Sequence, residues 1–303
     1  GAALLAPVFC RDFGPVRGLW MALFHSISAF CNAGIDLMGI RIPFSSLTLY
    51  AANPLVNLVI MALIIIGGIG FLTWEDIRSN HLHFSRYRMQ SKVILTTTAI
   101  LILLPALYFY FGEFRQGGFG TRILLSLFQS VTPRTAGFNA VDNGALSESS
   151  KFLSIVFMFI GGAPGSTAGG VKVTTIFVLL LSVRSTLTRT TGTNIFGRRL
   201  EESVITKSVV VLMFQLTLAL SATLAITAIS GYPVIDVAFE AFSALDTVGM
   251  STGITSSLST SCHIILILLM YLGRLGSLSF ALSFTDKKRI AHVMQPVEKI
   301  NVG

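Results

Sequence analysis

The sequence is poor in charged residues and in the residue patterns that most enzymes need. Asp, Glu, Lys and Arg make up 12% of its 303 residues, roughly half the share in an average soluble protein. The three cysteines have no metal-like spacing and the five histidines form no cluster. No Ser/His/Asp arrangement, zinc motif or phosphate-binding loop stands out. These absences argue against a hydrolase, a metalloenzyme and a nucleotide-binding enzyme.

Apolar residues are abundant and come in long runs. They account for 52% of the chain, and five segments are uncharged, or nearly so, over about 20 residues, the length that crosses a bilayer. The five segments are 54–74, 93–112, 152–183, 208–235 and 252–285. A soluble core does not string together five such runs, so the sequence predicts an all-α polytopic membrane protein.

The net charge of +8 is distributed in a way that favours a membrane protein over a nucleic-acid-binding one. Basic residues cluster in the loops 75–92 and 184–207 and in the tail 286–303, which fall on one side when the runs are threaded in order. The positive-inside rule makes that side cytoplasmic and the protein a multi-pass protein of the cell membrane. Aromatic residues are sparse in these loops, so we expect no nucleic-acid partner.

One motif occurs three times: a short amphipathic stretch, a small residue, a glycine and then a long apolar span. The stretches 18–31, 122–134 and 235–246 are too short to span a bilayer and too polar to face lipid, so each fits a re-entrant helix buried in protein. The glycines recur at intervals of about 100 residues, far longer than a solenoid repeat. A bend at such a glycine presents backbone carbonyls to a central axis, which suits a dehydrated monovalent cation. The expected ion-binding residues are Asn32, Ala33, Gly34, Ile35, Thr135, Ala136, Gly137, Phe138, Thr247, Val248, Gly249 and Met250.

A Gly-rich segment interrupts the third apolar run. Such a run is a poor helix, because glycine costs roughly 1 kcal/mol and proline about 3 kcal/mol per helical position. A helix that starts near Ser149 would place the break near mid-bilayer, where irregular backbone must line a cavity. A simple helix kink or a close helix–helix contact is the alternative. The residues of this segment are Gly161, Gly162, Ala163, Pro164, Gly165, Ser166, Thr167, Ala168, Gly169 and Gly170.

Two basic residues are expected to accompany this segment. Arg274 lies as far past its glycine as the Gly-rich segment lies past Gly137, which predicts a similar depth. A charged residue at that depth is costly and therefore functional by default, although Arg274 could instead snorkel to the interface. Its N–H groups could bond to freed carbonyls of the segment. Lys172 fits pore lining and snorkelling equally well.

Several motifs together resemble the Trk/Ktr/HKT superfamily of potassium transporters, and most closely its Ktr-type membrane subunits. The three glycine motifs look like the second, third and fourth filters of that superfamily, and the segments 67–71, 161–170 and 297–303 also match. The sequence departs from the usual pattern at Cys31, Ile35, Pro133, Asp246 and Met250. The resemblance covers essentially the whole chain.

The resemblance implies a fold of helix–pore helix–filter loop–helix repeats around a pseudo-fourfold pore. The expected units are a second repeat at 1–90, with most of its outer helix outside the sequence, a third at 91–202, a fourth at 203–286, and a cytoplasmic tail at 287–303. The first repeat is expected to lie outside the sequence as well. The Gly-rich segment would be an intramembrane gate, together with Lys172 and Arg274.

The implied function is K⁺ uptake through a carbonyl-lined filter, without enzymatic activity. No cofactor is expected, K⁺ is the transported ion, and Na⁺ would serve as a coupling or activating ion. The implied partners are a second copy in a membrane homodimer, a cytoplasmic nucleotide-binding regulatory ring and the lipid bilayer.

Two other functions compete with K⁺ uptake as interpretations of the sequence. A secondary transporter of another monovalent cation or small solute would favour inverted repeats, whereas these three motifs run in the same direction. An intramembrane hydrolase needs paired carboxylates, a Ser/His dyad or a metal site inside the spans, and none is visible in the sequence.

The sequence also predicts a buried ion pair. Arg134 and Asp246 lie equally far before Gly137 and Gly249, so both should border the filter in neighbouring repeats. A lone charge at that depth is costly, and a close opposite charge lowers the cost. Glu240 is the competing partner of Arg134, and bonds from Arg134 to nearby carbonyls alone are the remaining alternative.

Overall fold

The described residues of the chain are almost entirely helical or loop. The structure is a computed structural model and describes residues 1–81, 83–190 and 192–275. The α-helices are α1 (Ala2–Phe13), α2 (Pro15–Phe30), α3 (Pro54–Gly68), α4 (Phe71–Asn80), α5 (Met89–Tyr108), α6 (Phe119–Val131), α7 (Glu148–Phe159), α8 (Val173–Leu187), α9 (Glu202–Ser230), α10 (Val234–Leu245) and α11 (Thr260–Leu275). The 3-10 helices are η1 (Met38–Ile40), η2 (Thr48–Tyr50), η3 (Phe84–Arg86) and η5 (Thr255–Ser257), and η4 (Phe109–Glu113) is a π-helix. The strands β1 (Asn194–Ile195) and β2 (Arg198–Arg199) form an antiparallel hairpin.

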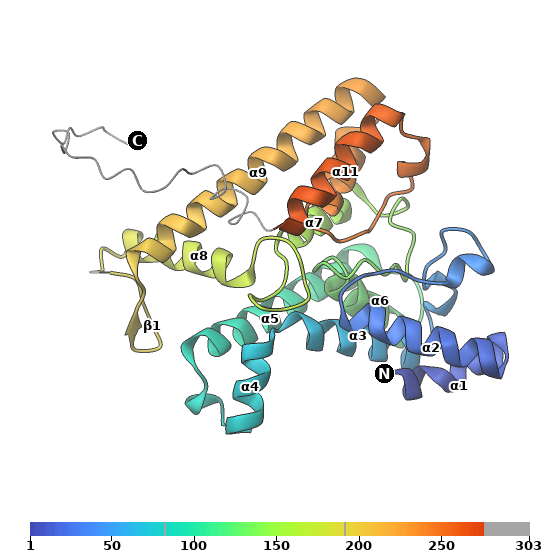
Figure 1. Cartoon of the computed structure of the whole chain (residues 1–303), viewed down its shortest axis with the longest axis horizontal. Coiled ribbons are helices and arrows are strands. Elements are labelled where there is room, and N and C mark those ends of the chain that lie inside the picture. Colours follow the sequence, from blue (N-terminus) through green and yellow to red (C-terminus); the bar gives the residue numbers. More distant parts are fainter. Residues whose placement is uncertain (82, 191, 276–303) are drawn as a thin grey trace.

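One succession of elements occurs three times along the chain. A first helix is followed by a short helix, a glycine-containing loop and a further helix: α1, α2 and α3, then α5, α6 and α7, then α9, α10 and α11. Figure 1 shows the last unit with α9 lying alongside α11. The short helices α2, α6 and α10 correspond to the three re-entrant helices that the amphipathic stretches predict.

The apolar runs form spans of two kinds. Met89–Glu113 and Glu202–Ser230 are single helices long and apolar enough to cross a membrane. The run 54–74 is not one span, because α3 and α4 meet at a 97° bend. The bend follows from Gly70, whose φ of +86° is open to glycine at no cost. Beyond Leu275, the end of the run 252–285 and the tail 286–303 lie outside the described residues.

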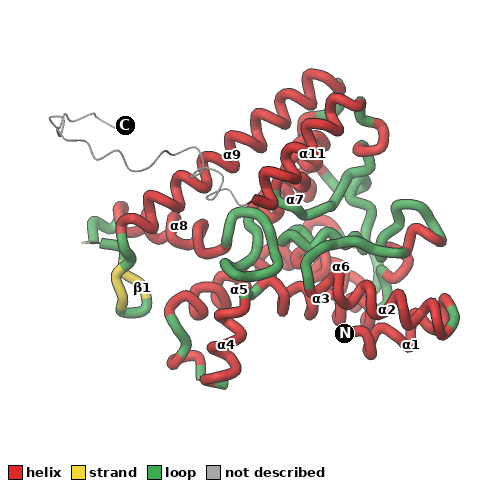
Figure 2. The backbone as a smooth tube through the Cα atoms, in the orientation of Figure 1, coloured by secondary structure: helices red, strands yellow, loops and turns green. Residues whose placement is uncertain are grey.

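The third apolar run breaks as the sequence predicts. Helix α7 begins at Glu148 and ends at Phe159, and α8 begins only at Val173. Between them residues 160–172 form an irregular loop (Figure 2, green), which we call the 160–172 loop.

The distribution of side chains fits a protein whose outside faces lipid. Apolar residues cover the outer surface, and Leu224 on α9 is 73% exposed. Polar residues such as His25, Gln129 and Glu240 are buried instead, and all three lie on the short helices. The buried apolar residues form two main clusters, one among α1, α2, α3 and α6 and one among α7, α9, α10 and α11.

Two glycines let a long helix approach the end of a short one. A Cβ atom on Gly67 of α3 would collide with the carbonyl oxygen of Phe30, the last residue of α2. A Cβ atom on Gly273 of α11 would collide in the same way with the carbonyl oxygen of Leu245, the last residue of α10. The C-terminal ends of α2 and α10 are therefore each packed against a glycine of their own unit.

We expect Gly67→Ala and Gly273→Ala to destabilise the protein, because a backbone carbonyl cannot move aside cheaply. Overpacking of this kind costs about 1–3 kcal/mol. The measurement is the thermal unfolding midpoint of the purified protein in detergent. Gly120→Ala is the matched control, since a Cβ atom there has no neighbour within 4 Å. Midpoints of the first two variants that equal the control's would contradict the interpretation.

Candidate functional site

The three short helices α2, α6 and α10 each end at a loop with the same backbone conformation. We call these segments Gly loop 1 (32–35), Gly loop 2 (135–138) and Gly loop 3 (247–250). In each, the first residue and the glycine have positive φ, a combination that non-glycine residues rarely adopt. The φ angles are +49° at Asn32 and +65° at Gly34, +66° at Thr135 and +84° at Gly137, and +55° at Thr247 and +89° at Gly249.

The N–H groups of the Gly loops point back to their own short helices. Ala33 donates to the carbonyl oxygen of Ser28 at 2.9 Å, and Val248 donates to that of Ser243 at 2.9 Å. Ala136 makes the equivalent bond to the carbonyl oxygen of Thr132 at 3.0 Å. Because the N–H groups of these peptides bond to the short helix, their carbonyl groups point away from that helix.

Nine carbonyls of the Gly loops are free. Within the described ranges, the first three carbonyls of each loop accept no hydrogen bond. A Cβ atom on Gly34 would collide with the carbonyl oxygen of Ala136, and one on Gly137 with that of Val248. Gly loops 1, 2 and 3 are therefore neighbours in this order. The nine residues are Asn32, Ala33, Gly34, Thr135, Ala136, Gly137, Thr247, Val248 and Gly249.

The fourth carbonyl of each Gly loop differs from the expectation. The carbonyl oxygens of Ile35, Phe138 and Met250 each accept a hydroxyl hydrogen bond from their own short helix, at 2.7, 2.5 and 2.6 Å. They are directed away from the other nine. Nine of the twelve expected ion-binding carbonyls therefore gather at one place, and three do not.

The two larger cavities that border the Gly loops lie on different sides of them. One, of about 560 Å³, is lined by all three loop glycines and by the acidic residues Asp36 and Asp142, and we call it the vestibule. The other, of about 530 Å³, lies between Gly loop 3 and Gly loop 1 and is also lined by Arg274. The arrangement can admit a cation from the vestibule to the free carbonyls.

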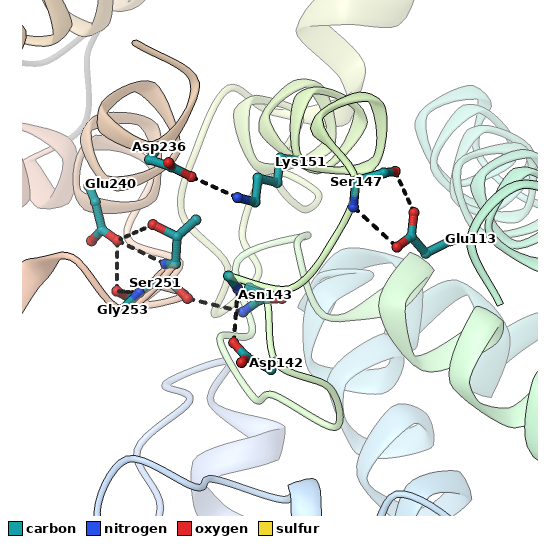
Figure 3. Close-up of polar contacts among 11 residues, drawn as sticks. Glu113, Asp142, Asn143, Ser147, Lys151, Asp236, Glu240, Ser251 and Gly253 are labelled. Atoms are coloured by element: carbon teal, nitrogen blue, oxygen red, sulfur yellow. Dashed lines mark hydrogen bonds and ion pairs between the residues drawn. The ribbon is translucent and has the colours of Figure 1, made fainter. Parts of the chain in front are cut away.

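Buried polar contacts hold the segments that follow the Gly loops. Figure 3 shows Glu240 of α10 facing Ser251 and Gly253, and Asn143 reaching toward the same segment. Glu240 accepts hydrogen bonds from the Ser251 hydroxyl at 2.7 Å and from the Thr252 N–H at 2.9 Å. The Asn143 amide donates to the carbonyl oxygen of Ser251 at 3.3 Å. The wall of the vestibule is thus tied to α10 and across to the preceding unit.

Two further contacts in the same view hold the start of α7, one to α10 of the next unit and one to η4 of its own unit. The Lys151 ammonium of α7 and the Asp236 carboxylate of α10 form an ion pair at 2.9 Å, and both side chains are mostly buried. The Glu113 carboxylate accepts bonds from the backbone N–H of Ser147 at 3.1 Å and from its hydroxyl. These bonds fix the N-terminal ends of α7 and α10.

The 160–172 loop is bonded to the bend between α3 and α4. The N–H of Ala163 donates to the carbonyl oxygen of Gly68 at 2.9 Å, and the N–H of Phe71 donates to the carbonyl oxygen of Gly165 at 3.0 Å. The backbone groups left unpaired between α7 and α8 thus bond to those left unpaired between α3 and α4. The loop and the bend form one hydrogen-bonded unit.

The same loop lies against the Gly loops on the side away from the vestibule. The Thr167 hydroxyl donates at 3.1 Å to the carbonyl oxygen of Phe30, the last residue of α2. The N–H of Gly169 donates to the Thr135 hydroxyl at 3.2 Å, and a Cβ atom on Gly169 would collide with the Thr247 hydroxyl. The loop therefore contacts the start of Gly loops 2 and 3 and the end of α2.

Of the two expected basic residues, Lys172, the last residue of the 160–172 loop, bonds to the loop's backbone, and Arg274 does not. The Lys172 ammonium donates to the carbonyl oxygen of Ala168 at 2.6 Å and to that of Gly169 at 3.4 Å. Arg274 lines the cavity beside Gly loops 1 and 3, and over the described ranges it makes no hydrogen bond to the loop. Its place beside the cavity keeps its positive charge close to the free carbonyls.

The expected ion pair between Arg134 and Asp246 is wrong. A guanidinium nitrogen of Arg134 donates to the Thr98 hydroxyl of α5 at 3.5 Å, and Asp246 accepts from the Gln215 amide of α9 at 3.2 Å. Among the described residues neither side chain has an oppositely charged group within 4.0 Å, so Glu240 is not the partner of Arg134 either. Each side chain points to the long first helix of its own unit, Arg134 to α5 and Asp246 to α9. Equal spacing before the glycines does not determine the direction in which a side chain points.

The sequence patterns did not single out the hydroxyl groups that hold the Gly loops. Ser28 and Ser243 lie on α2 and α10, and Thr132 directly follows α6; all three are buried and donate to the loops. The available signal was a Ser or Thr five or six residues before each glycine. Because serine and threonine are common and face many ways on a helix, that signal becomes specific only through its threefold recurrence.

Comparison with known proteins places the chain among cation transporters. Residues 10–93 and 87–292 match the TrkH family, described as cation transport protein. The chain is 35% identical to the potassium/sodium uptake protein NtpJ of Enterococcus hirae over 314 residues, covering 100% of this chain and 68% of that protein. It is also 35% identical to the Ktr system potassium uptake protein B of Bacillus subtilis over 308 residues, with the same coverage of 100% and 68%.

A solved structure supports the fold. The potassium transporter TrkH from Vibrio parahaemolyticus superposes with a TM-score of 0.75 at 19% identity, covering 94% of this chain and 61% of that one. Identity this low is informative about the fold alone. The match agrees with the all-α polytopic membrane fold that the sequence predicts.

Because Arg134 and Asp246 are not paired, we expect Arg134→Met and Asp246→Asn to act independently on stability. Their effects on the free energy of unfolding in detergent should add within about 0.5 kcal/mol, as for separate sites. A buried ion pair would instead cost about 3–5 kcal/mol when either partner is removed, and the double variant would recover much of that loss. A coupling energy above about 1.5 kcal/mol in this double-mutant cycle would contradict the geometry.

Proposed function

The chain belongs to the TrkH family of cation transport proteins, and on this premise we propose that it takes up K⁺ across the cell membrane. The ion enters through the vestibule and exchanges its hydration water for backbone carbonyls of the three Gly loops. The relatives are named as potassium or potassium/sodium uptake proteins, which favours a monovalent cation as the transported species.

The observation that carries this proposal is the set of nine free carbonyls. A buried polar group without a partner costs about 1–3 kcal/mol, so nine carbonyls that gather at one place need a cation or water between them. The short helices α2, α6 and α10 also end at the Gly loops, and the C-terminal end of a helix carries partial negative charge. Both features favour a cation and disfavour an anion.

The vestibule supports cation entry. Asp36 and Asp142 line it, and acidic residues at the mouth of a narrow passage raise the local concentration of cations. Both side chains also accept hydrogen bonds from nearby backbone N–H groups, at 2.9 Å from Met38 and at 2.9 Å from Gly144.

The 160–172 loop is proposed as the gate on the other side of the carbonyls. It lies against the Gly loops through Thr167 and Gly169, and the Lys172 ammonium is held at two of its carbonyls. Two positive charges, Lys172 and Arg274, then border the path below the carbonyls and raise a barrier to cations. Opening requires the loop to leave this position.

The remaining features of the proposal concern repeats, orientation and partners. The units 1–90, 91–202 and 203–286 act as three repeats around one path, and the basic segments 75–92, 184–207 and 286–303 face the cytoplasm. A second copy in the membrane and a cytoplasmic nucleotide-binding ring complete the transporter. Na⁺ acts as a coupling or activating ion. The family resemblance supports these features.

We expect Gly137→Ser to abolish K⁺ uptake and Gly249→Ser to weaken it. Both positions have positive φ, but only a side chain on Gly137 also collides with a carbonyl oxygen, that of Val248. The measurement is growth of a K⁺-uptake-deficient host at low K⁺, together with Rb⁺ uptake by the full-length protein.

Gly231→Ser is the matched control for these variants. It has φ +70° and no neighbour within 4 Å of a Cβ atom, and it lies at the end of α9, away from the Gly loops. It introduces the same backbone strain, about 1–2 kcal/mol, without touching the carbonyls. Equal growth of the Gly137 variant and the control would contradict the proposed path.

The gate is tested by neutralising its two charges. We expect Lys172→Met and Arg274→Ala each to raise the rate of K⁺ flux through the purified protein in liposomes, because each removes a positive charge beside the path. Arg184→Ala, at the C-terminal end of α8, is the charge-matched control and should leave the flux unchanged. Rates in the first two variants equal to those of the unchanged protein would count against the gate.

A further inference from the structure

Each short helix carries one hydroxyl group that reaches the residue after the glycine of its loop. Ser28 donates to the carbonyl oxygen of Ile35 at 2.7 Å. Ser243 donates to that of Met250 at 2.6 Å, and Thr132 donates to that of Phe138 at 2.5 Å. The three Gly loops thus end in one common contact.

The contact recurs although the sequence positions differ. Ser28 and Ser243 lie equally far before their glycines, whereas Thr132 lies one residue closer to Gly137. The residue at the serine position of the second unit is Val131, which has no hydroxyl. The hydroxyl contact therefore recurs although the donor residue stands at a different distance from the glycine. The recurrence does not result from a hydroxyl residue at one repeated position.

The contact decides which way the last carbonyl of each loop points. A hydroxyl on the helix behind the loop draws the carbonyl of Ile35, Phe138 or Met250 away from the nine free ones. In Gly loop 3 the same Ser243 oxygen also accepts the N–H of Gly249 at 3.1 Å, so one hydroxyl bonds to the two peptide groups that flank the peptide between Gly249 and Met250. The peptide that follows the glycine is held in one orientation.

A second side chain supports this hold in two of the three units. Glu240 accepts the N–H of Thr252 at 2.9 Å. His25 occupies the equivalent position on α2 and accepts the N–H of Leu37 at its Nε2 atom at 3.3 Å, while its Nδ1 atom donates to the carbonyl oxygen of Met21 at 2.7 Å. The equivalent residue of α6 is Phe128, which has no acceptor. In the second unit the support comes from another segment, because the Ser46 hydroxyl accepts the N–H of Asn139 at 3.1 Å.

We propose that Ser28, Thr132 and Ser243 are positioning residues that set the discrimination between K⁺ and Na⁺. The inference rests on the proposed function, because it concerns the same nine carbonyls. Selectivity of a carbonyl site depends on the number of ligands and on how far they can move. The hydroxyls fix the number at three per loop and keep the glycine carbonyl from rotating. Without a hydroxyl, the fourth carbonyl turns toward the path and the site contracts around the smaller ion.

The test uses Thr132, because one substitution at this position removes the hydroxyl donor and another keeps it. Thr132→Val keeps the shape and loses the hydroxyl, whereas Thr132→Ser keeps the hydroxyl. Ser126→Ala is the control on the same helix, because the buried Ser126 hydroxyl donates only to the carbonyl oxygen of Arg122, within α6, at 2.6 Å. The full-length protein is reconstituted in liposomes, and the K⁺/Na⁺ permeability ratio and the unfolding midpoint are measured.

We expect Thr132→Val to lower the K⁺/Na⁺ ratio about tenfold, the size of effect that a lost buried hydrogen bond produces. Thr132→Ser and Ser126→Ala should keep the ratio of the unchanged protein. Ser28→Ala and Ser243→Ala should lower it as well, because each removes the same hydroxyl contact from its loop. If Thr132→Val does not fold, the K⁺/Na⁺ permeability ratio of Ser243→Ala tests the proposal instead.

Two results would overturn the proposal. One is an unchanged ratio in Thr132→Val or, where that variant does not fold, in Ser243→Ala. The other is an equal fall in Thr132→Val and Thr132→Ser, which would assign the effect to packing of the methyl group. An unchanged protein that carries no K⁺ would instead contradict the proposed function itself, so the two failures are distinguishable.

Discussion

The structure depends on how backbone N–H and C=O groups are satisfied where the chain is irregular inside a membrane protein. Away from water, each unpartnered group is costly, so an irregular segment must bond to protein or to a ligand. In the Gly loops the two kinds of group are treated differently. The N–H groups of Ala33, Ala136 and Val248 are bonded to their own helices, and the carbonyls of the same residues are not bonded. The unbonded carbonyl oxygens therefore face one another with their partial negative charges, and a cation between them offsets this repulsion.

The same constraint explains the packing around the loops. The 160–172 loop has irregular backbone, and its backbone groups bond to one another, to the bend at Gly67–Phe71 and to the Thr135 hydroxyl of Gly loop 2. Gly67 and Gly273 allow the last carbonyls of α2 and α10 to approach the neighbouring long helices. These contacts join the two broken helices and the three Gly loops into one bonded unit. A movement of the 160–172 loop must therefore break bonds to both the bend and the Gly loops.

Much of this arrangement could be predicted from the sequence, because its signals are local. Gly34, Gly137 and Gly249 mark backbone that only glycine adopts freely, and the Gly-rich run 161–170 cannot remain helical. The 97° bend after Gly68 was not predicted, since the run 54–74 is apolar throughout and gives no sign of direction. The pairing of Arg134 with Asp246 failed for a related reason. Spacing along a short helix fixes the depth of a side chain, whereas its rotation depends on which long helix packs behind it.

The central claim is that one cation site lies among nine backbone carbonyls. It is tested most directly by anomalous X-ray diffraction from crystals of the full-length protein grown with Tl⁺ or Rb⁺ in place of K⁺. The account predicts anomalous peaks between the carbonyls of Ala33, Ala136 and Val248, and their loss in crystals grown with Na⁺ alone. Peaks confined to the carboxylates of Asp36 and Asp142 in the vestibule, with none among the carbonyls, would contradict it.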